Sequence, residues 1–109
     1  MAAILCVLED LAERGAEADL RVLLTRAEEV GFAGALAAVA EKTVPQRALV
    51  IAVENSKAIT GVGMGDGPVL RVGDRLTIFT PPVAAYCQAV ADKLAAKDKT
   101  FKYQRKLMD

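Results

Sequence analysis

The spacing of apolar residues changes at Pro45, and this change constrains the fold more than any other feature of the chain. Before it, apolar residues such as Ile4, Leu8 and Leu11 recur at helical spacing. After it, the run RALVIAVEN at 47–55 is rich in Val and Ile, as expected of a buried strand. Together these patterns predict an α+β fold, in which N-terminal helices precede a small β-meander or hairpin sheet and a C-terminal helix.

The first 43 residues are expected to be helical. Two further apolar series have helical spacing: Leu20, Leu23, Leu24, Ala27 and Val30, then Phe32, Leu36 and Val39. Gly15 separates the first two helices, and Asp19 is a candidate N-cap of the second. The apolar runs at 2–8 and 20–24 leave buried strands open as an alternative, although the acidic residues after the first run favour helix.

The segment beyond the first expected strand contains turns and two further strands. A polar turn at 55–57 leads into a returning strand, and four glycines within residues 61–67 then form a loop. Residues 69–79 again have the composition of strands, and a turn at Gly73-Asp74 is expected to divide them into two strands. Gly73 is expected to supply a positive φ there, and the carboxylate of Asp74 to accept hydrogen bonds from backbone amides just beyond it.

The last expected helix begins after the segment TPP. Thr80 is predicted to be its N-cap and Pro81 its first residue, because proline fits the first turn of a helix. Residues 97–109 follow with five basic and two acidic residues, a net charge of +3 that is interpreted as a solvated basic tail. Residues 1–43, by contrast, carry eight acids and four bases, a net charge of −4.

The composition argues against several classes of function. The chain has no histidine, which excludes His-dependent catalytic triads and ordinary His-containing zinc sites, and no catalytic residue, metal ligand or cofactor is predicted. With no Trp and five other aromatic residues, a base-stacking nucleic-acid surface is disfavoured. The glycine loop lacks the Gly-Lys-Ser/Thr ending of a P-loop, and Asp66 is explained as a turn residue.

The compartment is predicted to be the cytoplasm. The apolar runs, 48–53 among them, are all far shorter than the ~20 residues that span a bilayer. The apolar start has no preceding basic residue, so no secretory signal is predicted. Cys6 and Cys87 have apolar neighbours and are interpreted as small buried thiols in a reducing environment.

Residues 47–94 resemble the C-terminal domain of the regulators of potassium conductance, the TrkA-C domain. The segments ALVIAVENSKAI and VLRVGDRLTIFTPP, followed by a helix, carry the resemblance. Most of it rests on five positions: Leu70, Gly73, Asp74, Leu76 and Phe79. The resemblance implies a small α+β regulatory module that dimerises and binds a small anion or ion between protomers, with cyclic dinucleotides as one ligand class.

These observations lead to the prediction of a single domain over 1–109, with a helical segment at 1–43, the TrkA-C-like module at 47–96 and the basic tail. The predicted function is non-catalytic regulation by a small anionic ligand, such as a nucleotide, in a homodimer. The candidate ligand-binding residues are those of the polar turn, the glycine loop and the next strand: Asn55, Lys57, Gly63, Gly65 and Arg75. Alternatives are an adaptor that assembles through its N-terminal helices, and a small enzyme acting on a phosphorylated substrate.

Overall fold

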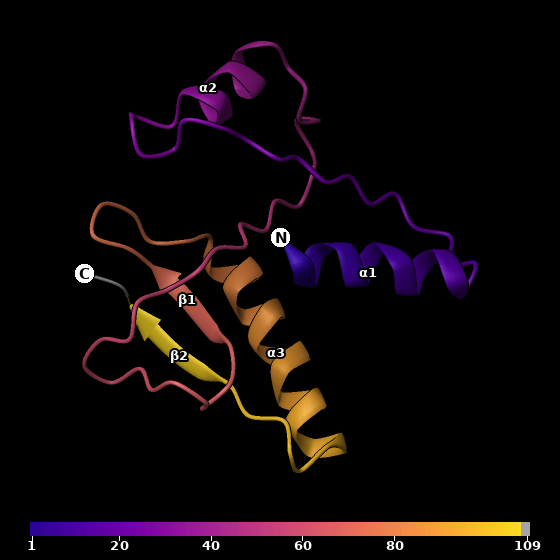
Figure 1. Cartoon of the computed structure of the whole chain (residues 1–109), viewed down its shortest axis with the longest axis vertical. Coiled ribbons are helices and arrows are strands. Elements are labelled where there is room, and N and C mark those ends of the chain that lie inside the picture. Colours follow the sequence, from indigo (N-terminus) through magenta and orange to yellow (C-terminus); the bar gives the residue numbers. More distant parts are fainter. Residues whose placement is uncertain (108–109) are drawn as a thin grey trace. The chain divides into compact units, whose positions relative to one another are not determined.

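The computed structural model describes residues 1–107, and these form two compact units that are considered separately (Figure 1). The first unit, Met1–Ala48, contains helices α1 (Ala2–Glu13) and α2 (Ala33–Ala40). The second begins at Leu49 and contains strand β1 (Val69–Gly73), helix α3 (Pro81–Lys97) and strand β2 (Gln104–Leu107). The predicted α+β class, with helix at the N-terminus, is confirmed.

Helix α1 follows the apolar spacing of its sequence. Ile4 and Leu11 are half-buried, and Arg14 lies 2.8 Å from the carboxylate of Asp10 one turn earlier. Gly15 then takes a φ of +59°, a backbone conformation that glycine adopts without strain, and its N–H donates to the Ala12 carbonyl oxygen. The predicted break at Gly15 is therefore confirmed.

The second predicted helix is absent from the structure. Residues 16–28 form no regular element, and Asp19 binds Arg21 at 3.1 Å instead of capping a helix. Ala27 has a φ of +59°, which interrupts any helical path, and Leu24 is 60% exposed. Helical spacing was misleading here because it records which residues are apolar and carries no information on whether a surface exists for them to pack against.

The second unit is a β-α-β arrangement. Strands β1 and β2 pair in parallel, with Val69 opposite Gln104 and Arg71 opposite Lys106. Parallel neighbours require a crossover, and α3 supplies it. Within the described residues the sheet is therefore not the expected meander: residues 48–58 form no strand, and the segment interpreted as a basic tail supplies β2.

A reverse turn follows β1, as expected from the Gly-Asp pair. The amide of Asp74 donates to the Thr77 carbonyl oxygen at 2.8 Å, and the Asp74 carboxylate accepts from the amides of Leu76 and Thr77 at 2.9 and 2.8 Å. The structural role predicted for Asp74 is confirmed. The positive φ expected at Gly73 is wrong: a Cβ there would lie 2.6 Å from the Thr77 carbonyl oxygen, so close approach explains the glycine.

The start of α3 also agrees with the sequence. Thr80 is its N-cap and proline occupies the first helical position. Within the described part of the chain, no helix is both long enough and apolar enough to cross a membrane.

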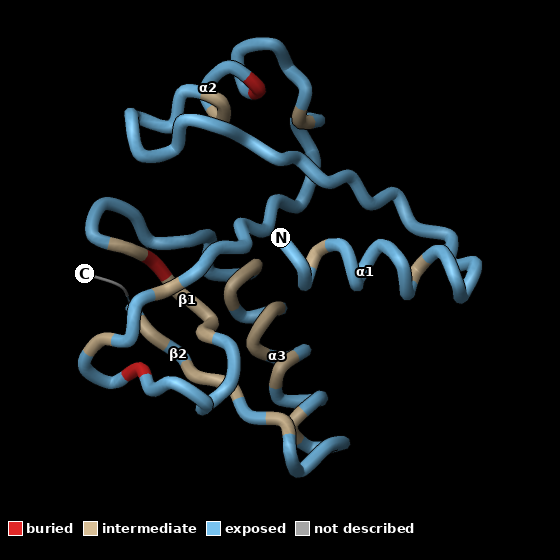
Figure 2. The backbone as a smooth tube through the Cα atoms, viewed as in Figure 1, coloured by how far each residue is buried: buried red, intermediate tan, exposed pale blue. Residues whose placement is uncertain are grey.

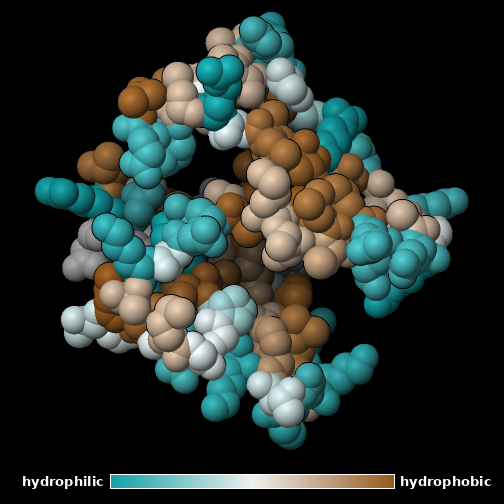
Figure 3. All heavy atoms as spheres, in the orientation of Figure 1, coloured by the Kyte–Doolittle hydropathy of each residue, from teal (hydrophilic) through white to brown (hydrophobic). Residues whose placement is uncertain are grey.

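Few side chains are buried in either unit. Among the described residues, the fully buried hydrophobic ones are Ala38 and Val62 (Figure 2), and hydrophobic residues are visible at the surface (Figure 3). Ile51, in the expected buried strand, is 60% exposed. Cys6 is exposed and Cys87 is half-buried, and both are free thiols, so the prediction that they are buried is wrong.

Candidate functional site

The two faces of the β1–β2 pair hold different kinds of residue. Successive side chains of a strand point to opposite faces, and residues opposite one another in register share a face. Arg71 of β1 and Gln104 and Lys106 of β2 therefore lie on one face, and each makes a polar contact with residues 54–67. Val72, Arg105 and Leu107 lie on the other face and line a pocket with α3. The second unit thus has a polar face and a pocket face.

On the polar face, Gln104 holds the glycine loop. Its Oε1 accepts from the Gly63 amide at 2.8 Å, and its Nε2 donates to the carbonyl oxygens of Gly63 and Gly67, each at 3.1 Å. Gly67 has a φ of +86°, and a Cβ at this position would collide with the Lys102 carbonyl group. The glycines of this loop therefore allow it to lie against the chain that enters β2.

Also on the polar face, Arg71 joins two residues of the preceding irregular segment. Its Nη1 donates to the carboxylate of Glu54, and its Nη2 donates to the Ser56 hydroxyl at 2.7 Å. The Arg71 side chain is only 21% exposed, whereas that of Glu54 is 56% exposed. Lys106 donates to the Thr60 carbonyl oxygen at 3.0 Å. Side-chain contacts, and not backbone hydrogen bonds between strands, therefore position residues 54–60.

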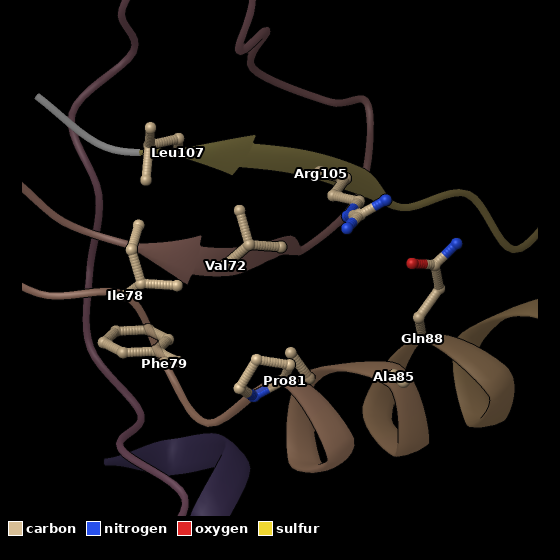
Figure 4. Close-up of a pocket in the computed structure, with 9 residues that line it drawn as sticks. Val72, Ile78, Phe79, Pro81, Ala85, Gln88, Arg105 and Leu107 are labelled. Carbon is tan, nitrogen blue, oxygen red and sulfur yellow. The ribbon is translucent and has the colours of Figure 1, made fainter.

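On the opposite face, a pocket of about 310 Å³ lies between the sheet and α3 (Figure 4). Its helix wall repeats at helical spacing, with Pro81, Ala84, Ala85 and Gln88. Its remaining walls come from β1, the segment after the turn, and β2: Val72, Ile78, Phe79, Arg105 and Leu107. The small alanines of α3 leave space that larger side chains would fill.

Two polar side chains occupy one end of this pocket. Figure 4 shows the guanidinium group of Arg105 and the amide of Gln88 near one another, while Phe79, Ile78 and Leu107 gather at the other end. No residue that lines the pocket is acidic. Within residues 1–107, the Arg105 side chain makes no hydrogen bond or ion pair, and its guanidinium group carries five N–H donors.

Two ionisable groups near these faces have shifted pKa values. Hydrogen bonds from the backbone amides of Leu76 and Thr77 lower the pKa of Asp74 below its ordinary value of 3.8. A 2.6 Å hydrogen bond to Asp92 raises the pKa of Tyr103 above 10.0, while the nearby charge of Arg105 lowers it slightly. Asp92 is therefore engaged by Tyr103.

The residues predicted to bind an anion are dispersed over several surface segments of the second unit. Asn55, Lys57, Gly65 and Arg75 are all exposed. The amide of Gly63, expected to face an anion, donates to Gln104 instead. Gly65 has a φ of +86° with open space around it. Anion binding by this group stays a prediction.

The sequence did not identify Gln88, Gln104 and Arg105. Gln104 and Arg105 belong to a segment that has the composition of a basic tail, and its pairing partner lies more than thirty residues earlier. A parallel strand of four residues has no hairpin turn to reveal it. The helical spacing of the small residues before Gln88 was the one available signal.

Comparison with known proteins gives one clear relationship. The family model of the M42 glutamyl aminopeptidases matches residues 1–108 of the chain. No curated protein and no solved structure matches the chain.

This match overturns the resemblance to the TrkA-C domain and the functions inferred from it. It extends over both units, including the first 43 residues that the TrkA-C resemblance did not cover, and it names a peptidase family. The prediction of a non-catalytic regulatory module is therefore wrong, and the adaptor alternative gains no support. The Gly-Asp turn that carried the resemblance is explained by local hydrogen bonding, which unrelated β folds can share.

Proposed function

The chain belongs to the family of M42 glutamyl aminopeptidases, and from this premise we propose that it takes part in removing amino-terminal residues from peptides. The observation that carries the proposal is the family match over residues 1–108. The pocket on the β1–β2 pair supports it, because its volume lies in the range of small-molecule sites and its walls combine apolar residues with a few convergent polar groups.

Hydrolysis of a peptide bond requires an activated water and stabilisation of the developing oxyanion. Aminopeptidases are among the enzymes that use two adjacent metal ions for both purposes. Within residues 1–107, no three His, Cys, Asp or Glu side chains gather to hold a metal, and the chain has no histidine. The described residues do not fit such a centre, so within the aminopeptidase proposal they are assigned the binding of substrate and no catalytic step.

One observation favours a second candidate function, the binding of peptide amino termini without their cleavage. It is the same lack of a metal-holding group among the described residues. In this case the chain would bind the amino termini of peptides, as an aminopeptidase does, but it would not hydrolyse the peptide bond.

The test is cleavage of amino-acid p-nitroanilides by the purified chain, with and without added Zn²⁺, Co²⁺ or Mn²⁺, and again after chelation. Cleavage that depends on a free α-amino group supports the aminopeptidase proposal, and N-acetylated substrates are the control. If no substrate is cleaved under any condition while dipeptides with free amino termini bind, the binding candidate holds and hydrolysis by this chain is rejected.

We further propose that the chain acts in the cytoplasm and forms a homodimer. The exposed Leu, Ile and Val side chains of both units support association, because monomeric proteins seldom expose large apolar areas. Sedimentation that finds only an 11.5 kDa species at high micromolar concentration would reject the dimer.

A further inference from the structure

We infer that Asp66 and Gly67 form a site of spontaneous isoaspartate formation, and that this modification releases the glycine loop from β2. The reaction joins the side-chain carboxyl group of an aspartate to the backbone amide nitrogen of the residue that follows it. It concerns the covalent structure of the loop and is independent of the proposed function.

The local sequence favours this reaction. Asp66 is the one aspartate of the chain that is followed by glycine. Glycine has no side chain to hinder the approach of its amide nitrogen to the preceding carboxyl group, and its backbone is less restricted than that of any other residue. Both properties favour closure of the five-membered succinimide ring, which is the intermediate of isoaspartate formation.

The two reacting groups have no competing hydrogen bond within residues 1–107. In this part of the chain, neither a hydrogen bond nor an ion pair involves the Asp66 carboxylate, and the Gly67 amide donates no hydrogen bond. The other aspartates of the same residues each have an engaged carboxylate: Asp10, Asp19, Asp74, Asp92 and Asp98. At Asp66, therefore, no contact has to break before the two groups can meet.

The backbone around Asp66 also has the freedom that ring closure requires. Asp66 and Gly67 are both exposed and belong to no helix or strand. Asp10 and Asp92, by contrast, lie in helices α1 and α3, whose regular dihedral angles hold each carboxyl group away from the next amide nitrogen. Exposed loops change their dihedral angles more readily than helices do.

The reaction conserves its atoms and needs no reactant other than water. The Gly67 nitrogen bonds to Cγ of the protonated Asp66 carboxyl group, and the hydroxyl of that group leaves with the amide proton as water. One water then opens the succinimide. Breaking the new bond restores aspartate. Breaking the bond between the nitrogen and the original backbone carbonyl carbon gives isoaspartate, in which the main chain runs through the Asp66 side chain.

The consequence for the loop follows from Gln104, whose contacts lie on both sides of the modified bond. Gln104 binds the amide and the carbonyl oxygen of Gly63 at 2.8 and 3.1 Å, and the carbonyl oxygen of Gly67 at 3.1 Å. Isoaspartate adds one carbon atom to the main chain between these two glycines, which is about 1.5 Å of extra chain. Since hydrogen bonds tolerate a narrower range of distances, we expect Gln104 to lose its contact on one side.

The experiment is an ageing study of the whole chain at neutral pH and physiological temperature. Isoaspartate is quantified by methyl transfer from an isoaspartyl methyltransferase, and its position is found by mass spectrometry of peptides. We expect most of the isoaspartate at residue 66. Its absence, or an even distribution over the aspartates, overturns the inference.

Variants of Asp66 test the assignment of the site. Asp66→Glu should abolish the modification there, because glutamate would have to close a less favourable six-membered ring. Asp66→Asn should accelerate it, since a neutral amide is attacked more readily than a carboxylate. Asp98→Glu is the matched control: Asp98 is also exposed, but its carboxylate binds Thr100 and a lysine follows it, so total isoaspartate should stay unchanged. An undiminished total in Asp66→Glu overturns the assignment.

Release of the loop is measured separately, by hydrogen exchange of the Gly63 amide before and after ageing. Exchange should become faster in the aged wild-type chain and stay unchanged in aged Asp66→Glu. Equal exchange before and after ageing, in samples that carry isoaspartate at residue 66, would overturn the release of the loop. None of these results depends on whether the chain cleaves peptides.

Discussion

Gln104 binds both backbone polar groups of Gly63: its Oε1 accepts from the Gly63 amide at 2.8 Å and its Nε2 donates to the Gly63 carbonyl oxygen at 3.1 Å. The two residues are 41 positions apart in the chain. A single amide side chain thus replaces a neighbouring strand for this part of the glycine loop. The strand β2 therefore has a second role besides pairing with β1, which is to fix the loop.

Replacing Gln104 with Leu should destabilise the chain by about 1–2 kcal/mol, because three backbone groups lose their partner and regain only solvent. The measurement is the urea midpoint, together with hydrogen exchange of the Gly63 amide, which should become faster. Gln46→Leu is the control, since Gln46 is exposed. An unchanged exchange rate at Gly63 in the Gln104 variant would show that the contact does not hold the loop.

Gly67→Ala should destabilise the chain more than Gly65→Ala. Both glycines have a φ of +86°, so both substitutions strain the backbone by about 1–3 kcal/mol. Only at Gly67 does the new Cβ also collide with the Lys102 carbonyl group, whereas Gly65 has open space around it. Thermal unfolding of the two variants separates the backbone strain, which both share, from the collision with Lys102, which occurs only at Gly67. Equal losses of stability would contradict the packing of the loop against Lys102.

Asp74 should make stability fall in acid. Since backbone hydrogen bonds lower its pKa in the folded chain, the ionised carboxylate stabilises the fold above the unfolded-state pKa. That contribution is lost as the pH falls from about 5 through the folded pKa. Asp74→Asn keeps an oxygen that accepts from both amides but does not titrate there, so its unfolding midpoint should depend less on pH in this range.

The control for Asp74 is Glu17→Gln, an exposed carboxylate that should leave the acid limb of the stability profile unchanged. Asp74→Leu, which removes the acceptor entirely, should be less stable than Asp74→Asn at neutral pH. Equal pH profiles for Asp74→Asn and the wild-type chain would reject this account of the turn.

Arg71→Lys should cost about 0.5–1 kcal/mol, because lysine cannot donate from two nitrogens to Glu54 and Ser56 at the same time. The effect is modest because Glu54 is more than half exposed. A double-mutant cycle that combines Arg71→Lys with Glu54→Gln measures the coupling energy between Arg71 and Glu54. A coupling energy indistinguishable from zero would mean that Ser56 and packing account for the position of Arg71.

The local features of this protein follow from residues that are close together in the chain. The helices α1 and α3, the break at Gly15, the Thr80–Pro81 start and the role of Asp74 each depend on neighbours within a few residues. The family match also comes from the sequence, through positions spread over nearly the whole chain. Helical spacing at 20–30 failed: the apolar residues of this segment are exposed in the structure, and helices gain most of their stability from packing.

The features that join distant segments depend on long-range pairing and could not be predicted from local patterns. The parallel pairing of β1 with β2 made a strand from a basic segment, because backbone hydrogen bonds to Val69–Gly73 became available there. That pairing placed Gln104 against the glycine loop and Arg105 in the pocket beside Gln88. Strand register and the facing of side chains depend on the partner strand, and a short parallel strand has no local turn that encodes its partner.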